Sequence, residues 1–211
     1  MEKRRPLRRQ SDDHHFASLL MLAVTTGAFM AGGLECHEGA FRFPSRVSHP
    51  LKASWQKQVL ASIGYRELGM FEDAARALEE IDPEEKTRNE VLYARVDIYL
   101  AAKKWDMAAA VASHLVKVDP ENPGAWINLA YSVRRAENIE QAEAVLLKAR
   151  ALHPKDASIA FNLACYASVT GRMEEAKVRL RQAIDLDKDI RLVALDDEDL
   201  RPLRDWIGGL K

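Results

Sequence analysis

Residues 123–156 read PGAWINLAYSVRRAENIEQAEAVLLKARALHPKD, and residues 157–188 read ASIAFNLACYASVTGRMEEAKVRLRQAIDLDK. The second stretch repeats the pattern of the first, because the tripeptide Asn-Leu-Ala at 128–130 returns 34 residues later at 162–164. A fixed period of this length is typical of stacked structural repeats. A single unit cannot bury its own apolar side, so we expect the rest of the chain to supply neighbouring units.

The same register continues towards the N-terminus. Ala176 and Ala142 are followed, at the same spacing, by Ala108 and Ala74. Small residues at one repeated position favour the close approach of two helices, so each unit is expected to hold a first helix, a tight turn and a second, antiparallel helix. The predicted units begin near Trp55, Asn89, Pro123 and Ala157.

Other residues fit a helical hairpin. Gly69 and Gly171 fall in the expected turns, where a positive φ is easiest for glycine. Pro120 and Pro154 follow the second helices of two units, because proline ends a helix. We expect Trp126, on a first helix, to be a core anchor between its own hairpin and the preceding one.

At these positions the chain resembles the tetratricopeptide repeat family. The strongest matches read AWINLA at 125–130, NIEQA at 138–142 and GRMEEA at 171–176, and the resemblance covers about residues 55–188. It implies an all-α fold, a right-handed α-solenoid of stacked antiparallel helix hairpins with a C-terminal capping helix. It also implies that the first helices line a concave face.

This interpretation divides the chain into four parts. Residues 1–15 form a basic N-terminal tail, and residues 16–50 form an apolar helix and a connector. Residues 51–188 form four tetratricopeptide repeats, and residues 189–211 form the capping helix.

The apolar run near the N-terminus has several interpretations. Phe16 to Leu34 contains no charged side chain over 19 positions, close to the ~20 residues that span a bilayer. With the basic residues before it, the run also resembles an export signal with cleavage after Ala28 or Gly33. The alternatives are a degenerate repeat or N-terminal cap buried in the array, a signal peptide, or a membrane anchor. They correspond to a cytoplasmic protein, with or without membrane association, or to one exported or anchored facing the periplasm.

The C-terminal segment predicts a cap. The acidic residues 196–199 suit the start of a helix, where the helix dipole favours negative charge. Leu200, Leu203, Trp206 and Ile207 follow at helical spacing. We therefore expect one helix that covers the last repeat.

The composition excludes several classes of function. The formal net charge of −1 argues against a general nucleic-acid binder, which needs a basic surface. The two cysteines, Cys36 and Cys165, have neither metal-ligand spacing nor a disulfide framework. The sequence contains no nucleophile motif and no phosphate-binding glycine loop. We therefore predict no catalysis, no metal site and no cofactor.

The remaining function is binding through a surface. The family resemblance implies that a partner peptide or helix lies on the first-helix positions, with Ile63, Arg66 and Ser168 on the same face. The predicted contact residues are Tyr93, Asp97, Ile127, Tyr131, Arg134, Phe161 and Cys165. The leading hypothesis is a non-enzymatic interaction scaffold or adaptor, with a link to a cytoskeletal or envelope assembly by family analogy. The alternatives are an anchored or exported envelope component that organises a complex, and packing of some of these side chains under neighbouring segments.

Overall fold

The computed structural model describes residues 54–210, so the expectations for residues 1–15 and for Phe16 to Leu34 lie outside the described residues. Within 54–210 the regular secondary structure is helical, without strands. None of these helices combines the length and the apolar character needed to cross a bilayer. The main helices are α2 (Trp55–Glu67), α3 (Phe71–Glu79), α4 (Asn89–Ala101), α5 (Trp105–Val118), α6 (Pro123–Ala136), α7 (Ile139–Leu152), α8 (Ala157–Val169) and α9 (Met173–Leu186).

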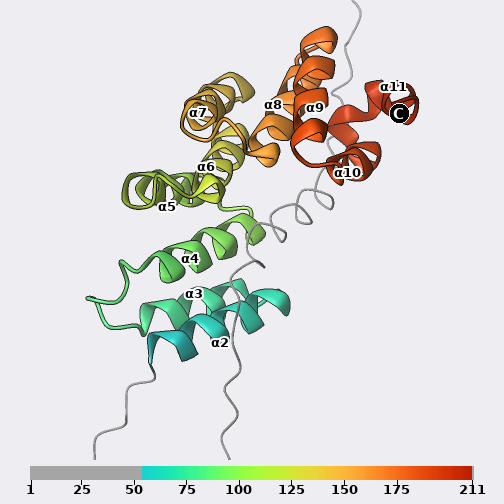
Figure 1. The fold of residues 1–211 in the computed structure, drawn as a ribbon. Coiled ribbons are helices and arrows are strands. Elements are labelled where there is room, and N and C mark those ends of the chain that lie inside the picture. The colour runs from blue at the N-terminus through green and yellow to red at the C-terminus, as the bar shows by residue number, and fades with distance from the viewer. Residues whose placement is uncertain (1–53, 211) are drawn as a thin grey trace, which may run out of the picture.

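The eight helices form four hairpins that stack in chain order (Figure 1). The first helices α2, α4, α6 and α8 begin 34 residues apart, at Trp55, Asn89, Pro123 and Ala157. Each second helix also contacts the first helix of the next unit. The expected all-α solenoid of helical hairpins is therefore confirmed.

Local sequence explains where the later helices begin. Pro123 occupies the first turn of α6, and the Asn122 side chain accepts a hydrogen bond of 2.9 Å from the Gly124 backbone N–H. Asn138 and Asp156 cap α7 and α8 in the same way. These short polar side chains satisfy N–H groups that have no partner inside the helix.

The turns within the hairpins use left-handed backbone. Gly69 and Gly171 have φ of 74° and 80°, as expected from their sequence positions. Lys103 occupies the same register and also has a positive φ, 56°, which is less favourable for a residue with a side chain. Lys103 thus adopts this conformation without glycine, whereas Glu137, at the same register in the third unit, has φ of −121°.

One repeated alanine position lies in the core of each hairpin. Ala74, Ala108, Ala142 and Ala176 are all fully buried, and so is Leu146, one turn after Ala142. Alanine at this register leaves the two helices of a hairpin close enough for larger neighbours to interlock around it. The hairpin core thus depends on a position where added volume has no space to occupy.

Trp126 differs from its expected role as a core anchor. It packs against the main core but is only partly buried. Its indole Nε1–H donates a hydrogen bond of 2.9 Å to the Pro120 carbonyl oxygen in the preceding loop. Because the polar edge of the ring needs this partner, Trp126 lies at the border of the core.

The C-terminal segment is not the single helix that was expected. It forms α10 (Ile190–Asp196), the 3-10 helix η1 (Glu198–Leu203) and α11 (Arg204–Gly208). Asp197 interrupts the helix because its backbone is extended, with ψ of 127°, and its side chain accepts a hydrogen bond from the Asp199 N–H. Pro202 lies inside η1 and lacks the N–H that a continuous helix would use.

These short helices nevertheless cover the last hairpin. Both η1 and α10 contact α8, and Figure 1 shows the red C-terminal segment beside the orange α8–α9 hairpin. Leu200 and Ile207 are fully buried, and Leu203 is nearly so. The segment therefore acts as a cap, and its acidic residues lie at the start of η1.

We predict that Ala142→Leu destabilises the array. The site is fully buried against a neighbouring helix, and overpacking of this kind costs about 1–3 kcal/mol. Ala144→Leu is the matched control, because Ala144 lies in the same helix and is exposed. Chemical denaturation of both variants would measure the effect. Equal stability of the two would show that the alanine register does not limit the helix approach.

A second prediction concerns the cap. Leu200→Ala should lower the free energy of unfolding by about 2–5 kcal/mol, because it empties a fully buried site between η1 and the array. Leu192→Ala, at a leucine of the same segment that is 66% exposed, should change it little. Thermal unfolding followed by circular dichroism distinguishes the two. Similar melting of parent and Leu200→Ala would contradict a structural role for the cap.

Candidate functional site

The candidate site is the surface formed by one register of the first helices, which we call the first-helix face. Ile63, Asp97, Tyr131 and Cys165 occupy equivalent positions on α2, α4, α6 and α8. These four helices are neighbours in chain order. Exposure falls along the series, from 37% at Ile63 through partial burial at Asp97 and Tyr131 to zero at Cys165. The face is therefore accessible at one end and covered at the other.

On α4 the face presents an aromatic and an acidic side chain. The Tyr93 hydroxyl donates a hydrogen bond of 3.2 Å to the Asp119 carboxylate, and burial together with that carboxylate raises the pKa of Tyr93. Burial also raises the pKa of Asp97 to about 6, and the positive charge of Arg66 partly offsets this shift. Both side chains are partly buried, so each offers one edge to solvent.

On α6 the face is mainly aromatic. The rings of Tyr131 and Trp105 meet edge to face, with centroids 6.1 Å apart and planes at 84°. The Arg135 guanidinium lies over both rings, 5.4 Å from the Tyr131 centroid and 5.8 Å from that of Trp105. Contacts of this type hold the rings in place, so Tyr131 is a rigid aromatic element of the surface. Ile127 is buried, with 9% exposure, and contributes to the core instead.

On α8 the predicted contact residues are inaccessible. Phe161 and Cys165 are fully buried, and Ser168 is 3% exposed. The Ser168 hydroxyl donates a hydrogen bond of 2.7 Å to the backbone carbonyl of Asp199 in η1. Phe161, Cys165 and Ile127 are therefore not accessible to a partner in this structure, in contrast to their predicted role as contact residues.

Arg134 also belongs to the cap contact. Its guanidinium Nη2 donates to the Asp199 carboxylate at 3.0 Å, and its Nη1 donates to the other carboxylate oxygen. The guanidinium carbon lies 5.2 Å from the centroid of the Tyr166 ring. A two-point Arg–carboxylate pair is geometrically specific, so it positions η1 on the face. Arg134 thus binds the chain's own cap in this structure, in place of the expected partner.

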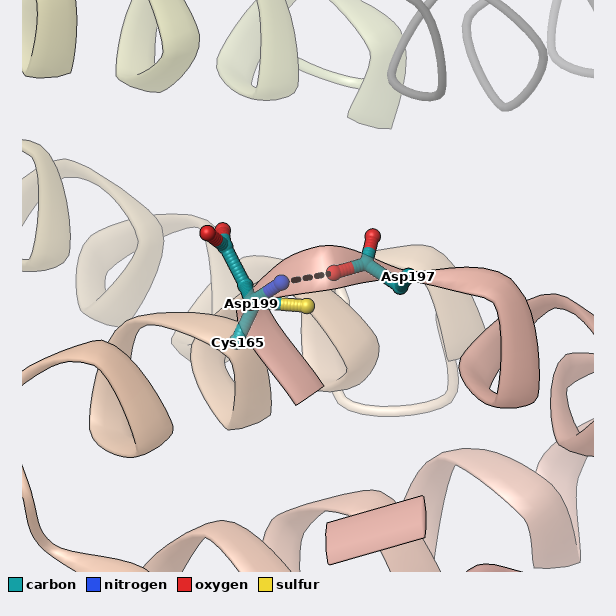
Figure 2. Close-up of side chains that lie close together, drawn as sticks. All are labelled: Cys165, Asp197 and Asp199. Carbon is teal, nitrogen blue, oxygen red and sulfur yellow. Dashed lines mark hydrogen bonds between the residues drawn. The ribbon is translucent and has the colours of Figure 1, made fainter. Parts of the chain in front are cut away.

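Cys165, Asp197 and Asp199 lie close together, and their potential ligand atoms lie within 4.8 Å of one another (Figure 2). The carboxylates of the set already have partners within the chain. Burial raises the pKa of the Cys165 thiol. Asp199 is neutralised by Arg134, and Asp197 accepts a hydrogen bond of 2.8 Å from the Asp199 N–H. The cluster is best explained as the polar contact between cap and array.

Sequence analysis missed the role of Asp197 and Asp199 in this contact. The sequence feature that could have indicated this contact is the run of acidic residues in the C-terminal segment, together with an arginine on the first-helix face. Arg134 and Asp199 are, however, 65 residues apart. Pairing over this distance depends on where the chain turns after α9. Residue patterns within one repeat do not contain that information.

The buried acid of the cap generates a pH prediction. Burial, with the nearby charge of Asp199, raises the pKa of Asp197 to about 6, above the ~3.9 of an unfolded chain. The folded protein therefore binds the proton more readily, so this group destabilises the fold as pH rises from about 4 through 6. Asp197→Asn should remove this destabilising contribution. The free energy of unfolding should then change with pH by roughly 1–3 kcal/mol less than in the parent, since one pKa unit is about 1.4 kcal/mol.

Urea unfolding between pH 4 and 7 measures this effect. Asp196→Asn is the control, because Asp196 is the exposed neighbour of Asp197. A parent and an Asp197→Asn variant with parallel pH profiles would contradict the buried state of this carboxyl group.

Comparison with known proteins identifies tetratricopeptide repeats in part of the chain. Two segments match the tetratricopeptide repeat family, residues 99–164 and residues 157–190. No curated protein matches the chain. The two matches cover the array from the end of α4 to α9.

Solved structures show the same fold. A thermophilic TPR protein of Thermus thermophilus is 20% identical, with a TM-score of 0.56, and the alignment covers 74% of this chain and 100% of that one. MamA MSR-1 is 18% identical with a TM-score of 0.53, covering 64% of this chain and 78% of the other. MamA RS-1, solved as a double mutant, is 16% identical with a TM-score of 0.55, covering 64% and 76%.

At these identities the likeness concerns the fold alone. The family matches add sequence evidence, and they fall on hairpins whose register and turn geometry agree with them. Residues 99–190 therefore consist of tetratricopeptide repeats, and the fold of the described residues is that of solved tetratricopeptide repeat proteins.

Proposed function

We propose that this protein is a non-enzymatic interaction scaffold that binds a peptide or helix of a partner protein along the first-helix face of α2, α4 and α6. The observation that carries the proposal is the gradient of exposure along this face. Ile63 is 37% exposed, and Tyr93, Asp97 and Tyr131 are each partly exposed, whereas Cys165 is covered by the cap. The open part of the face lies on three successive first helices.

The cap supports this choice of ligand. The short helix η1 lies on α8, buries Leu200 and Leu203, and pairs Asp199 with Arg134. The chain thus holds a short helical segment of its own on one end of the face. A partner segment with aliphatic side chains at helical spacing would find a similar environment on the open part.

Charges on the face would orient such a partner. Asp97 and Arg66 lie near enough for the arginine to affect the pKa of the carboxyl group. Tyr93 and Tyr131 supply aromatic surface between the charged groups, and tyrosine is common in binding hot spots. We therefore expect the aromatic side chains to contribute most of the affinity and the charges to set direction.

The side chains with shifted pKa values have structural explanations for those shifts, which favours a binding function over a catalytic one. The pKa values of Asp97 and Asp197 are raised mainly by burial, and Asp197 lies within the cap contact. Cys165 is fully buried and its raised thiol pKa disfavours a nucleophilic thiolate.

The test uses the full chain as bait. Partners would be isolated from the source cells, and the Kd of a purified partner would be measured for the parent and for Tyr131→Ser and Ile63→Ser. Removal of a hot-spot side chain costs about 2 kcal/mol or more, so we expect the Kd to rise by about 30-fold. Circular dichroism would verify that the variants remain folded.

Leu147→Ser is the matched control. Leu147 is 48% exposed but lies on the second helix α7, so its loss should leave the Kd unchanged. If Leu147→Ser weakened binding and the two first-helix variants did not, the partner would bind to the second helices and the proposal would fail.

A further inference from the structure

The outer side of α2 is an uncovered helix-packing surface. Leu60 is 70% exposed. Its equivalents in the next three units are Ala94, Asn128 and Asn162, with exposures of 7%, 5% and 3%. These positions are buried in α4, α6 and α8, each of which contacts the second helix of the preceding unit. Within the described residues, α2 has no such predecessor.

Gly64 and Leu68 extend this surface by one and two turns. An added Cβ on Gly64 would meet no heavy atom within 4 Å, and Leu68 is 74% exposed. The equivalents of Gly64 in α4 and α6 are Ile98 and Ser132, which are 2% and 0% exposed. Two leucines around a glycine form a shallow surface that another helix backbone can approach closely. We call Leu60, Gly64 and Leu68 the end face.

We propose that the end face of α2 binds Phe16–Leu34 of the same chain, which thereby acts as the N-terminal cover of the array. The run has 19 positions without a charged side chain. As a helix it would extend about 28 Å, against about 20 Å for the 13 residues of α2. It is thus long enough to cover the whole end face.

Connection and charge favour this occupant over a separate molecule. Residues 35–54 join the run to α2, and at about 3.3 Å each they can span the array end without constraint. A tethered segment acts at an effective concentration in the millimolar range, higher than that of a second copy of the chain in the cell. Lys57 borders the end face and is exposed, and Glu35, directly after the run, carries the opposite charge.

Disulfide formation in the full chain tests the contact. In a Cys36→Ser background, Leu60→Cys would be combined in turn with Ala23→Cys and Ala28→Cys, while buried Cys165 is left in place. Oxidation should give an intramolecular disulfide, seen as a faster band on a non-reducing gel. Val178→Cys replaces Leu60→Cys in the control, because Val178 is 58% exposed on α9 at a distant position.

Hydrogen exchange supplies an independent readout that does not depend on the chosen cysteine positions. Amides of residues 16–34 in the full chain should exchange about tenfold more slowly than in Leu60→Asp, since packed helices are protected. Leu192→Asp, at an exposed leucine of α10, should leave this protection unchanged. Because Leu60 is itself exposed, the charged substitution should not prevent folding of the array.

Three results would overturn the proposal. Disulfide-linked dimers in place of the intramolecular product would assign the end face to a second copy. Protection that appears only with phosphatidylglycerol vesicles, and is indifferent to Leu60→Asp, would assign the run to a membrane. Unprotected amides without vesicles, together with no disulfide specific to Leu60→Cys, would leave the end face uncovered. None of these results bears on partner binding by the first-helix face.

Discussion

The structure depends on the contact between the two helices of each hairpin at one alanine register. Ala74, Ala108, Ala142 and Ala176 are fully buried at equivalent positions, and larger residues such as Leu146 pack around them. This contact determines how close the helices lie and therefore which side of each hairpin is left for its neighbours. Since every hairpin retains an apolar side, the array is stable only if its internal sides are stacked and its two ends are covered.

The two ends of the array differ in this respect. At the C-terminal end the chain folds back as α10, η1 and α11, buries Leu200 and pairs Asp199 with Arg134. The same fold-back covers the first-helix face of α8, so capping and the extent of the binding surface are coupled. At the N-terminal end, α2 presents Leu60 at a register that is buried in every later unit. Within the described residues, the array thus has one covered end and one uncovered end.

The first-helix face combines properties that a scaffold needs. Its aromatic part is held rigid by the edge-to-face contact of Tyr131 with Trp105, which limits the entropy that a partner would have to offset on binding. Its acidic group, Asp97, is largely desolvated, so a basic partner group would interact with it more strongly than with an exposed carboxylate. The buried polar groups of the cap, in contrast, already have their hydrogen-bond and ion-pair partners within the chain.

The sequence by itself determined the helical repeat, the starts of the first helices and the glycine turns, because each arises from contacts within about one 34-residue unit. Only the tertiary structure decided that Phe161 and Cys165 are covered, that Arg134 binds Asp199, and that the expected C-terminal helix is divided at Asp197. These features depend on segments far apart in sequence meeting in space. A local pattern shows that a side chain is apolar or charged, but its accessibility depends on which distant segment lies over it.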